Sequence, residues 1–203
     1  MRASVLIYDG FDELDGIAPF EVLRVAEREG ADLHAELVTA AGAEDVTAAH
    51  GTRLRPEGPL AEGSPPDLLL IPGGGWNNRA PRGARAEYER GAIPALVARL
   101  HEHGVIIASV CTGAMLLAKA GLLINRHATT HHGALVDLRA AGAHLVEARV
   151  VDDGDIITAG GVTSGLDLAL WLVERFAGAA HAARVERVLE YERRGTVWRA
   201  AEE

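Results

Sequence analysis

The sequence predicts an α/β protein, a three-layer sandwich in which helices cover both faces of a mostly parallel, doubly wound, flavodoxin-like sheet. Two patterns support this prediction. Short, continuous apolar runs, typical of strands buried on both faces, alternate along the chain with longer segments of helical periodicity. Several of these runs end in glycines or small residues, at the strand ends where such sheets bind ligands.

The first part of the chain contains a strand, a helix and a second strand. Residues 3–8 are a short apolar run, and residues 13–29 have apolar positions spaced for a helix. We expect Pro19 in the first turn of this helix, where its missing N–H is harmless. Residues 33–39 alternate like a strand, and glycines and prolines between residues 51 and 66 indicate loops.

The middle of the chain repeats the pattern. Residues 67–71 (DLLLI) form a buried strand that ends in the turn 72-PGGGWNN-78. Residues 83–102 are predicted to form one long amphipathic helix, kinked at Pro94.

The remaining elements follow in order. Residues 105–110 (VIIASV) form another buried strand, and residues 112–121 a helix that ends at a glycine. Residues 149–158 indicate a hairpin, and residues 163–178 and 179–193 two further helices.

Composition limits the class of protein. The chain has 203 residues, 48% apolar and 24% charged, which predicts one globular domain over residues 1–195 and a short polar tail at 196–203. A net charge of -9 repels phosphate backbones, so we expect no nucleic-acid partner. The apolar run near the N-terminus is too short for a signal peptide or a membrane span, so we expect a cytoplasmic protein without membrane contact.

Cys111 is the single cysteine of the chain and stands where a strand gives way to a helix. One interpretation is an inert buried thiol. The other is a nucleophile on a sharp strand-to-helix turn, a nucleophile elbow that Gly113 and Ala114 leave room for. Unpaired N–H groups at the start of the following helix would then lower the pKa of the thiol and favour thiolate. We favour the nucleophile.

Two other segments fall at strand ends. The glycines of 72-PGGGWNN-78 are either a plain loop or a place where backbone N–H groups approach a ligand; the segment lacks a phosphate-loop motif. Asp15 is either a helix N-cap or a carboxyl that exchanges protons beside Cys111.

Adjacent histidines in 128-ATTHHG-133 form the last candidate segment. His131 or His132 is either a partner of the thiol or a wall or surface residue. No Cys, Asp or third His stands nearby at metal-ligand spacing, so we expect neither a metal nor another cofactor.

These segments together resemble the ThiJ/PfpI superfamily, which has a class I glutamine-amidotransferase-like fold, and within it most closely the isonitrile hydratases. The sensor domains of AraC-type regulators are similar as well. The matching segments are 14-LDGIAPFEVL-23, 71-IPGGG-75, 109-SVCTGAMLLAKAGLL-123, 128-ATTHH-132 and 160-GGVTSGLDLAL-170. The resemblance implies a homodimer acting on a small molecule.

The resemblance also implies site residues. It makes Cys111 the nucleophile, Asp15 the acid and Thr112 its neighbour in a lyase that adds water to R–N≡C to give a formamide. Gly74 and Gly75 would supply backbone N–H groups, and Trp76, His131 and His132 would line the mouth of the site. His132 and Trp76 depart from the family pattern, which leaves the substrate open. Alternatives on the same scaffold are a ligand sensor, a redox or stress-protection protein, and a glyoxalase or deglycase.

Overall fold

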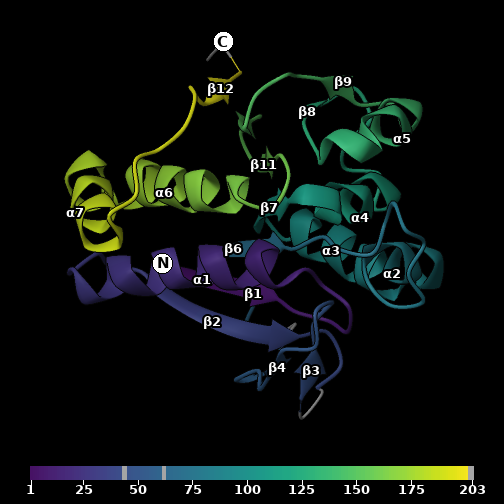
Figure 1. The fold of residues 1–203 in the computed structure, drawn as a ribbon, viewed down its shortest axis with the longest axis horizontal. Coiled ribbons are helices and arrows are strands. Elements are labelled where there is room, and N and C mark those ends of the chain that lie inside the picture. The colour runs from purple at the N-terminus through teal and green to yellow at the C-terminus, as the bar shows by residue number, and fades with distance from the viewer. Residues whose placement is uncertain (43–44, 61–62, 201–203) are drawn as a thin grey trace.

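An eight-stranded sheet runs through the middle of the molecule, which is described by a computed structural model over residues 1–42, 45–60 and 63–200 (Figure 1). Its strands are β1 (Arg2–Leu6), β2 (His34–Thr39), β5 (Gly58–Pro59), β6 (Leu68–Ile71), β7 (Ile106–Val110), β10 (Val150–Asp152), β11 (Ile156–Ala159) and β12 (Trp198–Arg199). They lie in the order β12-β10-β11-β7-β6-β1-β2-β5. Every neighbouring pair is parallel except β10 and β11, which form the predicted hairpin.

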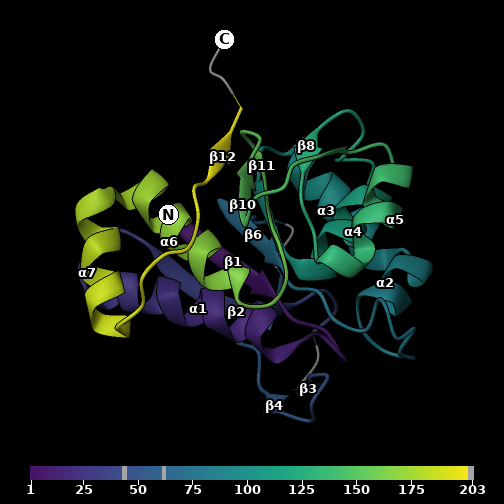
Figure 2. The same ribbon diagram turned by 45° about the horizontal axis from the view of Figure 1, so that its top comes forward.

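Helices cover the sheet in two groups. The first group is α1 (Glu13–Arg28), α6 (Ser164–Ala177) and α7 (Ala179–Leu189), which pack on one another. The second is α2 (Ala84–Arg90), α3 (Ala92–Glu102) and α4 (Ala114–Lys119). Figures 1 and 2 show the two groups on opposite sides of the sheet. The predicted three-layer α/β fold is therefore confirmed.

The central strands are buried because both of their faces are covered. All four residues of β6 are fully buried, and so are Ile107, Ala108 and Val110 of β7. Continuous apolar runs of this kind are what a parallel sheet between two helical layers requires. In the described part of the chain, no helix is both long and apolar enough to cross a membrane.

Three predicted helices differ in detail. The helix expected over residues 83–102 is two helices, because Gly91 adopts a left-handed φ of 78° between α2 and α3; Pro94 lies near the start of α3 rather than at a kink. Pro19 lies inside α1, beyond its first turn, so the carbonyl of Asp15 loses its helical N–H partner. The helix expected from residue 112 begins as a 3₁₀ turn, η1 (Cys111–Gly113), before α4.

Several short elements were not predicted from the sequence. Between α4 and β10 lie β8 (His127–Ala128), η2 (His132–Ala134), α5 (Leu135–Ala140) and β9 (His144–Leu145), and β3 (Val46–Thr47) pairs with β4 (Arg53–Leu54). Helix α7 ends at Leu189 because Glu190 is left-handed. Within the segment expected to be a polar tail, β12 pairs with β10 at the edge of the sheet.

Candidate active site

Cys111 directly follows β7 and has a left-handed φ of 57°, which is uncommon for a residue with a side chain. Its backbone N–H donates to the carbonyl of Gly160 at 2.8 Å. The turn is tight: a Cβ on Gly113 would lie 2.2 Å from the carbonyl oxygen of Ile71, so only glycine fits there. The predicted elbow after the strand is therefore confirmed, with the thiol nearly buried at its tip.

Asp15 lies in the first turn of α1 and is completely buried. It is not the N-cap of this helix, since Asp12 holds that position and accepts the N–H of Leu14. Asp15 Oδ2 accepts the backbone N–H of Gly73 at 3.1 Å, whereas the buried Oδ1 makes no close hydrogen bond to a described residue. Oδ1 is thus available to exchange a proton with a nearby group.

The thiol of Cys111 interacts directly with the Asp15 carboxyl. Burial, and then the charge of Asp12, raises the pKa of Asp15 to about 7. Burial, and then the Asp15 carboxylate, raises the pKa of the Cys111 thiol to about 12, although N–H groups of Val162 and Thr112 bond to it. The prediction that the helix start lowers the thiol pKa is therefore wrong: burial beside a carboxylate outweighs the N–H groups. At neutral pH the proton rests on sulfur, and ionised Asp15 can take it.

Thr112 connects the elbow to the glycine turn after β6. Its hydroxyl accepts the N–H of Gly74 at 3.0 Å. That N–H is therefore already bonded and does not point freely at a ligand, as the sequence prediction assumed. The backbones are so close that a Cβ on Gly73 would lie 2.5 Å from the nitrogen of Thr112. Gly75 lies further along, with a φ of 68°.

Trp76 does not line the mouth of the site, contrary to expectation. Its side chain is buried, and its indole N–H donates to Asp137 Oδ2 of α5 at 2.7 Å. Its ring meets Tyr88 of α2 edge-on, and the guanidinium of Arg85 stacks over it at 4.3 Å. Trp76 therefore links α2 to α5. Because Trp76 directly follows the glycines, these contacts also help to fix the position of the glycine turn.

The two histidines lie side by side, with ring centroids 4.1 Å apart. His131 packs on Gly161, where a Cβ would lie 2.7 Å from its Cδ2, and its Nδ1 faces the side-chain amide of Asn77 at 3.3 Å. Burial, and then His132, lowers the pKa of His131, so its imidazole is neutral at pH 7. His132 borders a cavity of about 690 Å³ that Thr130 and Gly161 also line.

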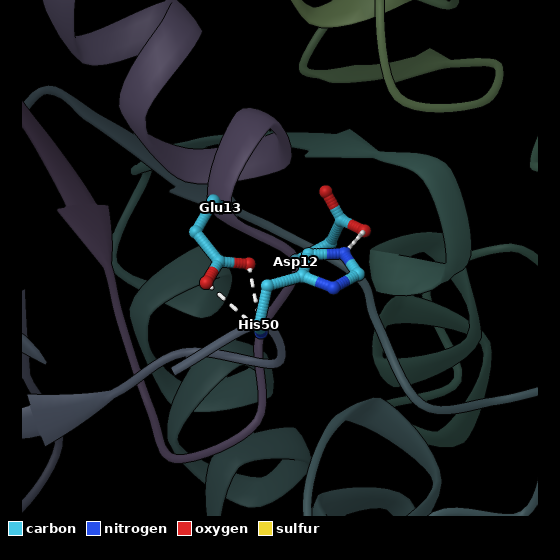
Figure 3. Close-up of side chains that lie close together, drawn as sticks. All are labelled: Asp12, Glu13 and His50. Carbon is cyan, nitrogen blue, oxygen red and sulfur yellow. Dashed lines mark hydrogen bonds and ion pairs between the residues drawn. The ribbon is translucent and has the colours of Figure 1, made fainter. Parts of the chain in front are cut away.

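A cluster of Asp12, Glu13 and His50 lies at the start of α1 (Figure 3). The three side chains each bring one atom that could bind a metal within 4.8 Å of the others. The carboxylate of Glu13, however, already accepts the backbone N–H groups of His50 and Thr52, and His50 Nε2 lies 3.6 Å from Asp12 Oδ2. These contacts anchor the loop after β3 to α1.

Four residues near the thiol were not singled out from the sequence. Gly73 bonds Asp15, the Thr130 hydroxyl donates to the Cys111 carbonyl at 2.7 Å, and the Val162 N–H reaches the sulfur. The hydroxyl of Tyr8 donates to the carbonyl of Pro72, and its charge interacts with that of Cys111. Gly73, Thr130 and Val162 all fall in the segments that carry the resemblance, which is the signal that could have found them.

Comparison with known proteins gives the family of the chain. The family model of the DJ-1/PfpI family matches residues 1–175. The isonitrile hydratase of Pseudomonas putida is 31% identical over 94% of this chain and 78% of its own length. A deglycase of Pyrococcus abyssi is also 31% identical, over 78% of this chain and 89% of its own. The crystal structure of a ThiJ/PfpI family protein from Pseudomonas syringae superposes with a TM-score of 0.80 at 28% identity, covering 96% of this chain and 76% of that one.

The fold and the elbow thiol therefore define a protein of the ThiJ/PfpI type. The chain belongs to the DJ-1/PfpI family. This family includes enzymes with different activities, among them an isonitrile hydratase and a deglycase. Each of these two relatives is 31% identical to the chain.

Proposed function

We propose that the protein is an isonitrile hydratase-like enzyme, which adds water to R–N≡C and releases an N-substituted formamide. The observation that supports this most is the buried pair of Asp15 and Cys111. A carboxyl with a pKa of about 7 both accepts and donates protons near neutral pH, and this carboxyl interacts with the thiol.

The first half of the proposed reaction forms a covalent intermediate. Asp15 takes the proton of the Cys111 thiol, and the sulfur attacks the terminal carbon of the isonitrile. Asp15 then returns the proton to that carbon, giving the thioimidate R–N=CH–S–Cys111. The N–H groups of Thr112 and Val162 stabilise the sulfur while it carries negative charge.

The second half releases the product. Water adds across the C=N bond with Asp15 as base, giving R–NH–CH(OH)–S–Cys111. The hydroxyl proton leaves as the carbonyl forms, the C–S bond breaks, and the sulfur regains a proton. The sum is R–N≡C plus water to R–NH–CHO, with the protein unchanged.

The test is turnover of an alkyl and an aryl isonitrile, with formamide measured by chromatography. We expect formamide from the wild type and none above background from Cys111→Ala. Equal rates for the two proteins would reject the proposal. The intact mass of the wild type under turnover, compared with that of Cys111→Ala, reports the thioimidate. Absence of an adduct together with turnover would favour direct activation of water by Asp15.

A glyoxalase or deglycase activity on small dicarbonyls is the second candidate. Asn77 and the neutral His131 place polar groups near the site, which suits carbonyl oxygens, and the deglycase relative has the same identity as the hydratase. Methylglyoxal consumption without isonitrile turnover would select this activity. A thiol that is buried and protonated reacts slowly with peroxide, which argues against a redox sensor.

We also expect a homodimer that acts on a small molecule in the cytoplasm, without nucleic-acid or membrane partners. Light scattering of the purified protein measures the oligomeric state directly.

A further inference from the structure

The turn between β11 and α6 holds a strained residue against the thiol. Val162 has a φ of 37°, a conformation that β-branched residues rarely adopt. The carbonyl of Gly160 in the same turn accepts the Cys111 N–H at 2.8 Å, and the Val162 N–H favours the thiolate form of Cys111 by lowering its pKa. Strain of this kind persists only where the surrounding structure enforces it, so something must hold residues 160–163 in place.

Arg149 contacts both ends of this turn. Its backbone carbonyl accepts the N–H of Gly160 at 2.9 Å, and its guanidinium donates to the Thr163 hydroxyl at 3.2 Å. The same guanidinium pairs with Asp167 in the first turn of α6, with Nε 2.7 Å from Oδ2. Arg149 therefore ties the turn to the helix that follows it.

Asp167 is nearly buried, with 3% of its side chain exposed, and both oxygens are bonded. Besides Arg149, it accepts the Tyr191 hydroxyl at 3.2 Å and the backbone N–H of Arg194 at 2.7 Å. Helix α6 and the segment after α7 thus converge on one carboxylate. A buried charge with this many partners is costly to disturb, so it can hold a strained neighbour.

We propose that the Arg149–Asp167 pair is a positioning device for Cys111. By fixing residues 160–163, it keeps the Val162 N–H on the sulfur and the Gly160 carbonyl on the Cys111 backbone. Arg149 also lines the cavity that His132 and Gly161 border, whereas Asp167 is nearly buried and is not among the lining residues. Tyr191 and the Arg194 backbone extend the device to the C-terminal segment.

The device acts on the thiol and not on any particular electrophile. Other groups that act on the sulfur are the carboxyl of Asp15, the hydroxyl of Tyr8 and the backbone N–H of Thr112. None of them contacts the Arg149–Asp167 pair in the contacts described. Thiol reactivity therefore tests the inference separately from isonitrile turnover. Cys111 is the only cysteine, so a thiol reagent reports on it alone.

The chain offers a matched control on the same helix. Asp152 is also nearly buried and pairs with Arg175 of α6 at 2.8 Å, and it accepts the Trp171 indole N–H as well. Arg149 and Arg175 have almost equal exposure, 30% and 29%. The Asp152 pair lies toward the other end of α6, about 12 Å along the helix at 1.5 Å per residue.

The experiment compares Asp167→Asn with Asp152→Asn in the full chain. Alkylation of Cys111 by iodoacetamide is followed from pH 6 to 10 under native conditions, with thermal unfolding measured in parallel. We expect Asp167→Asn to slow alkylation at least tenfold at every pH of this range, which lies below the thiol pKa of about 12, because the turn that holds Cys111 relaxes and the sulfur loses an N–H group. We expect Asp152→Asn to stay within twofold of the wild type despite a similar loss of thermal stability.

Equal slowing by both variants would mean that general destabilisation is responsible, and it would overturn the inference. Unchanged or faster alkylation in Asp167→Asn would overturn it as well. If Asp167→Asn does not fold, Arg149→Lys and Tyr191→Phe decide by the same comparison. Alkylation at least tenfold slower than in Asp152→Asn across the range supports the device, and a rate within twofold of the wild type rejects it.

Discussion

Replacing Asp15 by Asn is expected to stabilise the protein at pH 8 while removing the carboxyl that we propose activates Cys111. The pKa of the carboxyl rises from 3.8 to about 7 on folding, chiefly because it is buried. This difference of about three pH units, at about 1.36 kcal/mol each, corresponds to about 4 kcal/mol. The amide of Asn still accepts the N–H of Gly73, so the substitution removes mainly the cost of burying a charge.

The sign of the pH dependence follows from the two protonation states. Below pH 3.8 the carboxyl is protonated in the folded and unfolded chains, and it costs nothing. As the pH rises, the unfolded chain ionises first, so wild-type stability falls until the pH passes about 7 and stays lower above it. The Asp15→Asn variant lacks this loss. The difference in free energy of unfolding should therefore be small at pH 4.5 and reach about 4 kcal/mol at pH 8.

Urea unfolding, followed by tryptophan fluorescence at pH 4.5, 6 and 8, measures this difference. With about 2–3 kcal/mol per molar urea, the midpoint at pH 8 should rise by about 1–2 M. Glu13→Gln is a control in which the free energy of unfolding should change in the opposite direction, falling at pH 8 instead of rising. Partial burial raises the pKa of Glu13, but backbone N–H groups, including those of His50 and Thr52, lower it overall. An Asp15→Asn variant no more stable than the wild type at pH 8 would refute the reasoning.

Three further substitutions test the geometry of the elbow. Gly113→Ala should lower the free energy of unfolding by about 3 kcal/mol or more, since its Cβ would meet the Ile71 carbonyl oxygen at 2.2 Å. In the control Gly58→Ala the new Cβ has nothing within 4 Å, so the loss should be under about 0.5 kcal/mol. Thermal unfolding measures both. Thr112→Val should cost about 1–3 kcal/mol in urea because it leaves the partly buried N–H of Gly74 unpaired, and Thr112→Ser should restore most of this. Val162→Asn should raise the free energy of unfolding by about 1 kcal/mol, because Asn tolerates a φ of 37° better; a loss would show that the turn is not strained.

The sheet and the position of the thiol could be predicted because they depend on local pattern. Apolar runs mark the strands, and a parallel sheet brings the ends of neighbouring strands together. Asp15 follows β1, Gly73 follows β6 and Cys111 follows β7, and these three strands are adjacent. Residues far apart in the sequence therefore meet at one edge without any long-range information beyond strand order.

Other features depend on contacts that no local pattern reveals. Trp76 points away from the site because Asp137, 61 residues later, accepts its indole N–H. The pKa of Cys111 depends on how deeply the elbow is buried and on the facing carboxylate, which outweigh the start of the helix. The break at Gly91 was missed because the periodicity of α2 and α3 continues across it, while a single left-handed residue changes the direction of the chain.

The outermost strands, β5 and β12, determine how this sheet can meet another chain. Each is two residues long, and β5 includes Pro59, which has no N–H to offer a further strand. An incoming chain thus finds few free backbone groups at either edge to extend the sheet. Within the described residues, these short edges disfavour growth of the sheet from molecule to molecule, which is the first step toward fibrils.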